Sequence, residues 1–127
     1  MRRIGSLLSD RRGATAVEFS LILPALLLLL FGIVEFGRLL WTQSALHFAV
    51  EEAARCATVD AANCGSASAV QSFAVARAAG LGLQKSVFSL TSPACGNQVS
   101  ASYPFPFVLA TLFPYSITLT AQSCFPK

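Results

Sequence analysis

One carboxylate stands at the start of a long apolar run, and it is the side chain whose chemistry the sequence defines best. Glu18 follows Arg11-Arg12-Gly13 and precedes a stretch, residues 19–34, that carries no charge. A charge at membrane depth costs roughly 2.5 kcal/mol or more unless it has a partner, so an ionisable group here is a functional candidate. The alternative is a carboxylate at headgroup level, where the dipole at the start of a helix also favours negative charge.

Two further charges lie at the other end of the apolar run. Glu35 and Arg38 are three residues apart. On one helix this spacing predicts an ion pair at the outer membrane surface, and a contact with another subunit is the sharper alternative.

The net charge of +3 lies entirely before Ala14. The side chains that set it are Arg2, Arg3, Arg11 and Arg12, opposed by Asp10. Basic residues just before an apolar span keep that end in the cytoplasm, so we expect everything after about Arg38 in the periplasm. The later charges balance, which leaves no basic face to follow phosphates, and nucleic-acid binding is not expected.

Four cysteines follow the apolar run, on the side expected to be oxidising. An even number predicts two disulfides, for which three pairings are possible. We favour Cys56 with Cys64 and Cys95 with Cys124, because each pair brackets one local unit of the chain. Free buried thiols are the alternative. A zinc site is not expected, because no close Cys-x-x-Cys pair occurs and the only histidine, His47, is well upstream.

No catalytic constellation is visible in the sequence. There is one histidine, no Gly-rich phosphate loop follows a strand, and the serines near the C-terminus have no plausible His and Asp partners. His47 is expected to be solvated or packed on a helix. We therefore expect no enzyme activity, no cofactor and no metal.

The sequence patterns around these residues predict helices followed by an antiparallel sheet, and therefore an α+β fold. The run from Ala14 to Val34 is about long enough to cross a hydrocarbon core of ~30 Å as a helix, which Pro24 should bend. From Arg38 to Arg55 there is no Gly or Pro, and an apolar stripe recurs with helical period. We predict one continuous helix from about Thr15 to Cys56, half in the membrane and half outside.

The rest of the chain should form a small disulfide-stapled domain. We predict a loop over residues 57–66, a helix over 67–79 capped by Ser66 or Ser68 and ended by Gly80 and Gly82, and an antiparallel sheet of strands 87–91, 99–103 and 116–121. The expected domains are a basic leader over 1–13, a transmembrane helix half over 14–37 and a periplasmic α+β domain over 38–127.

The connection between the last two strands, Pro104 to Pro114, is far more apolar than an ordinary loop. A loop folded over the sheet as part of the core is one interpretation, because so small a domain needs its apolar surface. A membrane or partner contact is the other.

The segment Arg11-Arg12-Gly13-Ala14-Thr15-Ala16-Val17-Glu18-Phe19, the leucine-rich run with Pro24 and the segment Phe31-Gly32-Ile33-Val34-Glu35-Phe36-Gly37-Arg38 together resemble the TadE-like pseudopilins of tight-adherence (Flp) pilus systems. The resemblance spans about Arg11 to Arg55. Gly-x-x-x-x-Glu-Phe is specific only in combination with the downstream Glu-Phe-Gly. The remainder fits in layout alone.

The resemblance implies cleavage after Gly13 by a prepilin peptidase of the inner membrane. Ala14 would become the N-terminus, with Glu18 fifth and Phe19 sixth, and in pilin-like proteins the new amino group and the fifth-position carboxylate are thought to pair between subunits. The implied role is a minor pseudopilin in pilus assembly for adhesion or secretion. Its implied partners are the peptidase, other pilins and pseudopilins, the inner-membrane assembly platform and the lipid bilayer.

Three rival functions were weighed. A secreted protein with an ordinary signal peptide is disfavoured, because the apolar run is longer than a typical h-region and no convincing Ala-x-Ala site follows it. A signal-anchored periplasmic binding module, in which the helix is only a tether, stays open. A major pilin is disfavoured, because such subunits are usually little more than the N-terminal helix.

Overall fold

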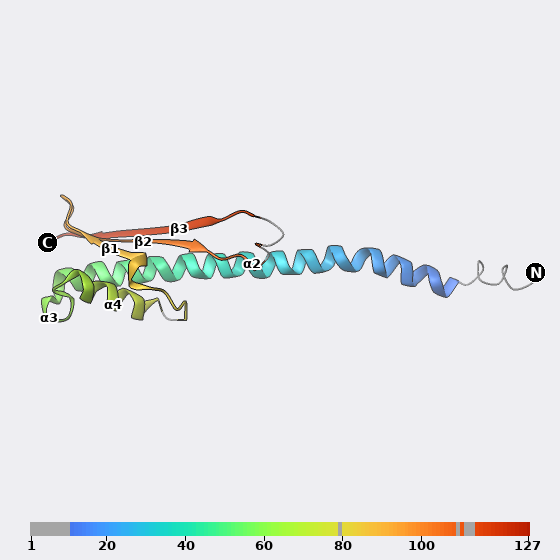
Figure 1. The fold of residues 1–127 in the computed structure, drawn as a ribbon, viewed down its shortest axis with the longest axis horizontal. Coiled ribbons are helices and arrows are strands. Elements are labelled where there is room, and N and C mark those ends of the chain that lie inside the picture. Colours follow the sequence, from blue (N-terminus) through green and yellow to red (C-terminus); the bar gives the residue numbers. More distant parts are fainter. Residues whose placement is uncertain (1–10, 79, 109, 111–113) are drawn as a thin grey trace, which may run out of the picture. The chain divides into compact units, whose positions relative to one another are not determined.

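The computed structural model describes residues 11–78, 80–108, 110 and 114–127 (Figure 1). The chain divides into two compact units, residues 1–36 and 37–127. The described residues of the first unit, 11–36, belong to one long helix. The second holds the rest of that helix together with the short helices and the sheet.

The long helix, α2, runs from Arg11 to Val59 and is continuous through Pro24. The predicted helix is therefore confirmed, with both ends a few residues further out. Arg, Ala and Leu are strong helix formers, and Gly13 opposes the helix by only about 1 kcal/mol relative to Ala. Of the predicted leader, residues 1–10 lie outside the described residues, and Arg11–Gly13 are helical rather than irregular.

The predicted loop over residues 57–66 is wrong in most of its length. Helix α2 continues to Val59, and a short helix, α3 (Ala61–Cys64), follows at once. Asp60 separates the two, and its carboxylate accepts hydrogen bonds from the Asn63 backbone N–H at 3.1 Å and from the Asn63 side-chain amide at 2.7 Å. Because this cap satisfies a free N–H at the start of α3, the alanine-rich segment stays helical where turn-forming residues predicted a loop.

Helix α4 spans Ala67–Arg77 and confirms the predicted second helix. Its cap is Ser66, whose hydroxyl accepts the Ala69 N–H at 3.2 Å. Gly80 and Gly82, both with positive φ, follow the helix as expected for residues that end one. Ala79 lies outside the described residues. A single 3-10 turn, η1 (Lys85–Val87), then leads into the sheet.

Three antiparallel strands form one sheet in the order β1-β2-β3, confirming the predicted strands. The strands are β1 (Phe88–Thr91), β2 (Asn97–Phe105) and β3 (Ile117–Phe125). Ala101 in the centre faces Phe88 on one side and Ala121 on the other. Strand β2 extends through Pro104, which was expected to open the connection; Pro104 instead pairs in register with Thr118.

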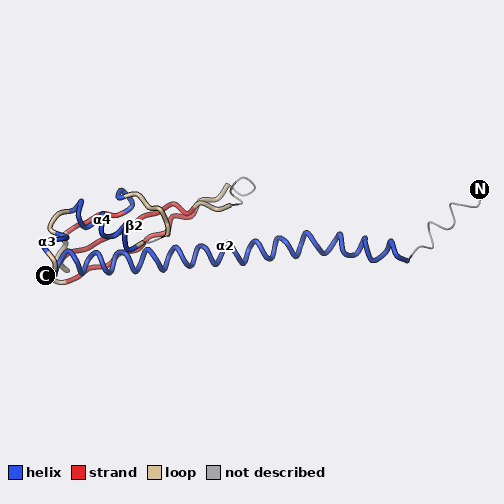
Figure 2. Tube along the Cα trace, turned by 90° about the horizontal axis from the view of Figure 1, so that it is seen from below, coloured by secondary structure: helices blue, strands red, loops and turns tan. Residues whose placement is uncertain are grey.

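One face of the sheet packs on α2 and α4 to form the core, so the chain is α+β as predicted (Figures 1 and 2). In the middle of β2 and β3 alternate side chains are buried, because successive residues point to opposite faces of the sheet. The predicted apolar stripe of α2 is confirmed by buried Leu46, Ala49, Val50 and Ala53, while its first member, Leu39, is partly buried. The largest fully buried residues are Phe88, Leu46, Val50, Val70 and Val99.

A glutamine side chain from each of two helices donates a hydrogen bond to an edge strand of the sheet. The Gln43 amide of α2 donates to the Thr120 carbonyl on β3 at 2.9 Å, and the Gln71 amide of α4 donates to the Phe88 carbonyl on β1 at 2.8 Å. Unpaired edge carbonyls otherwise invite pairing with another chain. These two contacts also fix the height of each helix against the strand beside it.

Both predicted disulfides are present and leave no free cysteine among the described residues. Cys56–Cys64 ties the end of α2 to α3, with Cα atoms 5.7 Å apart. Cys95–Cys124 ties the β1–β2 turn to the end of β3, with Cα atoms 6.3 Å apart. Gly96 completes that turn at φ +128°, where an added Cβ would collide with the Phe125 carbonyl. The disulfide therefore closes a turn that only glycine fits.

Candidate functional site

The N-terminal part of α2 carries an apolar surface that the chain itself does not cover. Within the described residues, α2 is a helix long and apolar enough to span a membrane. Fourteen large apolar side chains between residues 17 and 36 are exposed. At ~1.5 kcal/mol or more for each side chain removed from water, covering them gains on the order of 20 kcal/mol. A hydrocarbon environment or another apolar surface would provide that cover.

Glu18 lies near the start of this surface, one helical turn after Ala14. At 1.5 Å per residue, the four-residue step places the two positions on the same face of α2, about 6 Å apart along its axis. Val17 and Phe19 beside Glu18 are exposed apolar side chains. The helix thus presents a carboxylate on its outer surface among groups that favour hydrocarbon.

Among the described residues, nothing in the fold requires a glycine at position 13. An added Cβ there would meet nothing within 4 Å, and the residue is helical. Glycine inside a helix costs about 1 kcal/mol relative to Ala, so the fold alone would favour another residue. Any requirement for glycine at this position therefore comes from something that binds the chain.

Comparison with known protein families identifies this segment. Residues 13–55 match the family model described as TadE-like protein. This segment of the chain is similar to TadE-like proteins. The TadE-like match begins at Gly13, includes Glu18, Glu35 and Arg38, and ends at Arg55 within α2. Comparisons with curated proteins and with solved structures gave no match.

The match covers the candidate residues of α2 and stops before the sheet. Similarity of this segment to TadE-like proteins, together with one long apolar N-terminal helix, is consistent with a membrane-anchored, pilin-like protein. The family match does not extend beyond Arg55, so the rest of the chain is described by its fold alone.

Arg38 is held against the end of β2. Its guanidinium lies 5.2 Å from the centre of the Phe105 ring, and its Nη2 donates to the Pro106 carbonyl at 3.5 Å. The predicted ion pair between Arg38 and Glu35 stays a prediction. The cation–π contact was not visible in the sequence, because it joins residues far apart in the chain.

His47 lies on the exposed surface of α2, as expected. Its Nε2 is 2.9 Å from Nε2 of Gln43, the residue that also reaches β3. Across the described ranges, no group of His, Cys, Asp or Glu side chains is arranged to hold a metal.

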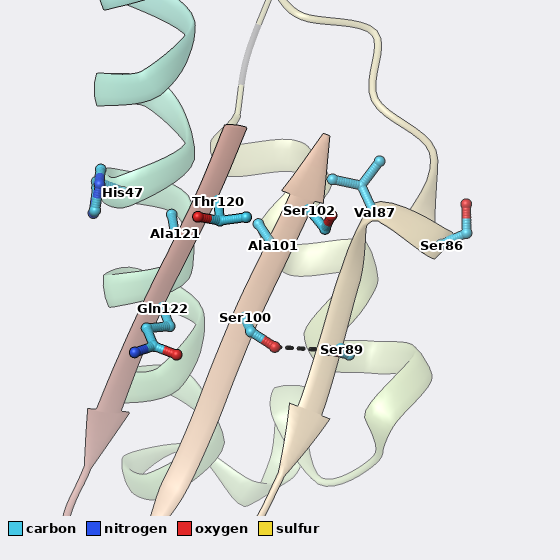
Figure 3. A pocket seen from close by; sticks show the side chains of 10 residues that line it. All are labelled: His47, Ser86, Val87, Ser89, Ser100, Ala101, Ser102, Thr120, Ala121 and Gln122. Carbon is cyan, nitrogen blue, oxygen red and sulfur yellow. Dashed lines mark hydrogen bonds between the residues drawn. The ribbon is translucent and has the colours of Figure 1, made fainter. Parts of the chain in front are cut away.

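The outer face of the sheet carries uncharged polar side chains that sequence reasoning did not single out. Ser89, Ser100 and Thr120 help to line a shallow pocket there. Figure 3 shows Ser89 and Ser100 joined by a hydrogen bond across two strands, with His47 on the neighbouring helix. The Oγ atoms of these two serines are 2.7 Å apart. Alternation of Ser, Thr and Gln with apolar residues in β2 and β3 was the available signal. The face offers hydroxyl and amide groups without a strong acid or base.

Proposed function

We propose that the chain is a minor pseudopilin of a tight-adherence pilus system, a non-enzymatic assembly component cut by a prepilin peptidase between Gly13 and Ala14. The observation that carries the proposal is that the TadE-like match begins at Gly13, just before a carboxylate presented on an exposed apolar helix. The proposed orientation has the N-terminus in the cytoplasm, because the net positive charge lies before Ala14.

Cleavage would create the partner that Glu18 needs. The new amino group of Ala14 is a cation one turn from the carboxylate, so each subunit offers one charge of each sign at nearly the same depth. An ammonium and a carboxylate in hydrocarbon offset each other's desolvation, whereas either alone is penalised. Pairing between neighbouring subunits would thus join processing to assembly.

Residues 37–127 would lie in the periplasm and make the specific contacts of the subunit. Two disulfides support this location, because disulfides persist in oxidising compartments. Other pilin-like helices, the assembly platform and the lipid bilayer are the proposed partners.

The first experiment expresses the full chain with its peptidase and measures intact mass. The wild type should lose residues 1–13, whereas Gly13→Leu and Gly13→Arg should keep them. Gly32→Leu is the matched control, because Gly32 is also helical and an added Cβ there also meets nothing within 4 Å. If the wild type keeps its leader, as both Gly13 variants should, the proposal is refuted. The signal-anchored binding module would then be the favoured function.

The second experiment tests the carboxylate after cleavage. Glu18→Gln removes the charge with little change of shape, so we expect normal processing but loss of crosslinking to other pilin-like subunits. Glu51→Gln is the control, because Glu51 is exposed on α2 well past the apolar run. Crosslinking of Glu18→Gln at the wild-type level would refute the role of the ion pair.

A further inference from the structure

Contacts at its two ends fix the direction of β2 along α2. At the start of β2, the Asn97 amide donates to the Ala57 carbonyl at 3.0 Å. At its end, the Pro106 carbonyl accepts from Arg38. Strand β2 therefore runs from the C-terminal end of α2 back toward Arg38.

The lengths of the two elements agree with this arrangement. Nine steps of a strand from Asn97 to Pro106 cover about 30 Å at ~3.3 Å each. Nineteen steps of a helix from Arg38 to Ala57 cover about 29 Å at ~1.5 Å each. The β2–β3 connection, residues 106–116, consequently begins at the level of Arg38.

Exposed aromatic and apolar side chains gather at this end of the second unit. Trp41 is 70%, Val108 69% and Tyr115 77% exposed. The start of the connection is anchored, because Phe105 is buried and Phe107 packs edge-on against it with ring centres 5.1 Å apart. The two interpretations of the apolar 104–114 segment therefore apply to different residues. Phe105 and Phe107 at its start pack in or against the core, whereas the Val108 side chain is exposed. Leu109 and residues 111–113 lie outside the described residues.

The level of Arg38 is close to a membrane surface if α2 spans a bilayer. A hydrocarbon core of ~30 Å takes about 20 helical residues, from Thr15 to Val34. Arg38 then lies about 6 Å further on, within the headgroup layer. Trp41 is one turn later, but a helical side chain tilts toward the N-terminus and covers the preceding turn. Its indole ring is thereby brought nearer the bilayer.

We propose that Trp41, Val108 and Tyr115 form an interfacial patch that lies in the headgroup layer of the bilayer. This rests on the membrane span in the proposed function. Trp and Tyr prefer the membrane interface, where the ring is partly in hydrocarbon and the polar group meets water. No Asp, Glu, Lys or Arg occurs between residues 86 and 126, so no charge in the connection opposes burial among lipids. Arg38, held against Pro106, adds a cation at phosphate level.

Trp41 is the only tryptophan of the chain, which makes it a built-in probe. The full chain is reconstituted into vesicles of phosphatidylcholine and phosphatidylglycerol that carry a nitroxide quencher either near the headgroup or near the end of the acyl chain. The wild type is compared with Trp41→Phe variants that also carry Val108→Trp, Tyr115→Trp or Val59→Trp. Val59 is the matched control, because it is 71% exposed and apolar but lies at the far end of α2 from Arg38.

We expect the tryptophan at positions 41, 108 and 115 to emit at shorter wavelength in vesicles, with severalfold more quenching by the shallow label than by the deep one. The Val59→Trp control should be quenched by neither. Water-like, unquenched emission at 108 and 115, equal to the control, would overturn the patch. A blue shift that occurs only after other pilin-like subunits are added would also overturn it, in favour of a protein contact. No peptidase is present, so the result does not depend on processing after Gly13.

Discussion

The Cys95–Cys124 disulfide should contribute a large share of the stability of the sheet, and its contribution follows from the loop that it closes. The bond joins residues 29 apart. Closing a loop of that length in the unfolded chain removes entropy worth about 3.5 kcal/mol at 25 °C. Cys95 is exposed and Cys124 only half-buried, so replacing both sulfurs by hydroxyls removes little buried surface. The double variant Cys95→Ser/Cys124→Ser should therefore lose about 3.5 kcal/mol, nearly all of it from the lost bond.

Amide hydrogen exchange of β2 in the full-length protein in mild detergent measures this loss. Strand β2 is the central strand, so its amides report opening of the sheet. A loss of about 3.5 kcal/mol predicts exchange about 400-fold faster. The single variants Cys95→Ser and Cys124→Ser must lose the same amount, because either one breaks the bond. A loss below about 1 kcal/mol, or single variants that differ widely, would refute the loop-closure reasoning.

Three further predictions concern the same unit. Phe88→Ala should lower the free energy of unfolding of this unit by about 3–5 kcal/mol, because the Phe88 ring is only 1% exposed. Phe125→Ala is the control in thermal unfolding and should show a much smaller loss, because the Phe125 ring is partly exposed at a strand end. Gly96→Ala should cost about 1–3 kcal/mol by the same measurement, since its backbone is strained for any other residue; an unchanged melting temperature would contradict the turn geometry. Hydrogen bonds from the side chain and backbone of Asn63 hold the pKa of Asp60 below its ordinary value of 3.8. The ionised Asp60 carboxylate therefore stabilises the fold above pH 3.8, and this stabilisation disappears as the pH falls through the lowered pKa. The stability difference between wild type and Asp60→Asn should accordingly shrink on acidification. A difference that grows would contradict a lowered pKa of Asp60 in the folded protein.

The sequence predicted the elements whose signals are local. The apolar run and the stripe after Arg38 predicted α2, and the alternation after Leu83 predicted the strands. The disulfide pairing followed from neighbourhood along the chain and was correct. The loop after Cys56 was wrong, because Asp60 acts as a helix cap and the alanines around it favour helix over turn.

The contacts that place the sheet against α2 could not be predicted. Gln43 with Thr120, Asn97 with Ala57 and Arg38 with Phe105 each join residues forty or more positions apart. No periodicity encodes which strand faces which turn of a helix. For the same reason the sequence left two interpretations of the 104–114 segment, and the structure buries Phe105 while exposing Val108.

N-terminal sequencing of the full chain made with its native peptidase tests the central claim most directly, because it reads processing and register together. Cleavage after Gly13 gives a mature protein that begins Ala14-Thr15-Ala16-Val17-Glu18, with the carboxylate at the fifth position. A protein that still begins at Met1, or one cut at another bond so that Glu18 is no longer fifth, would contradict it.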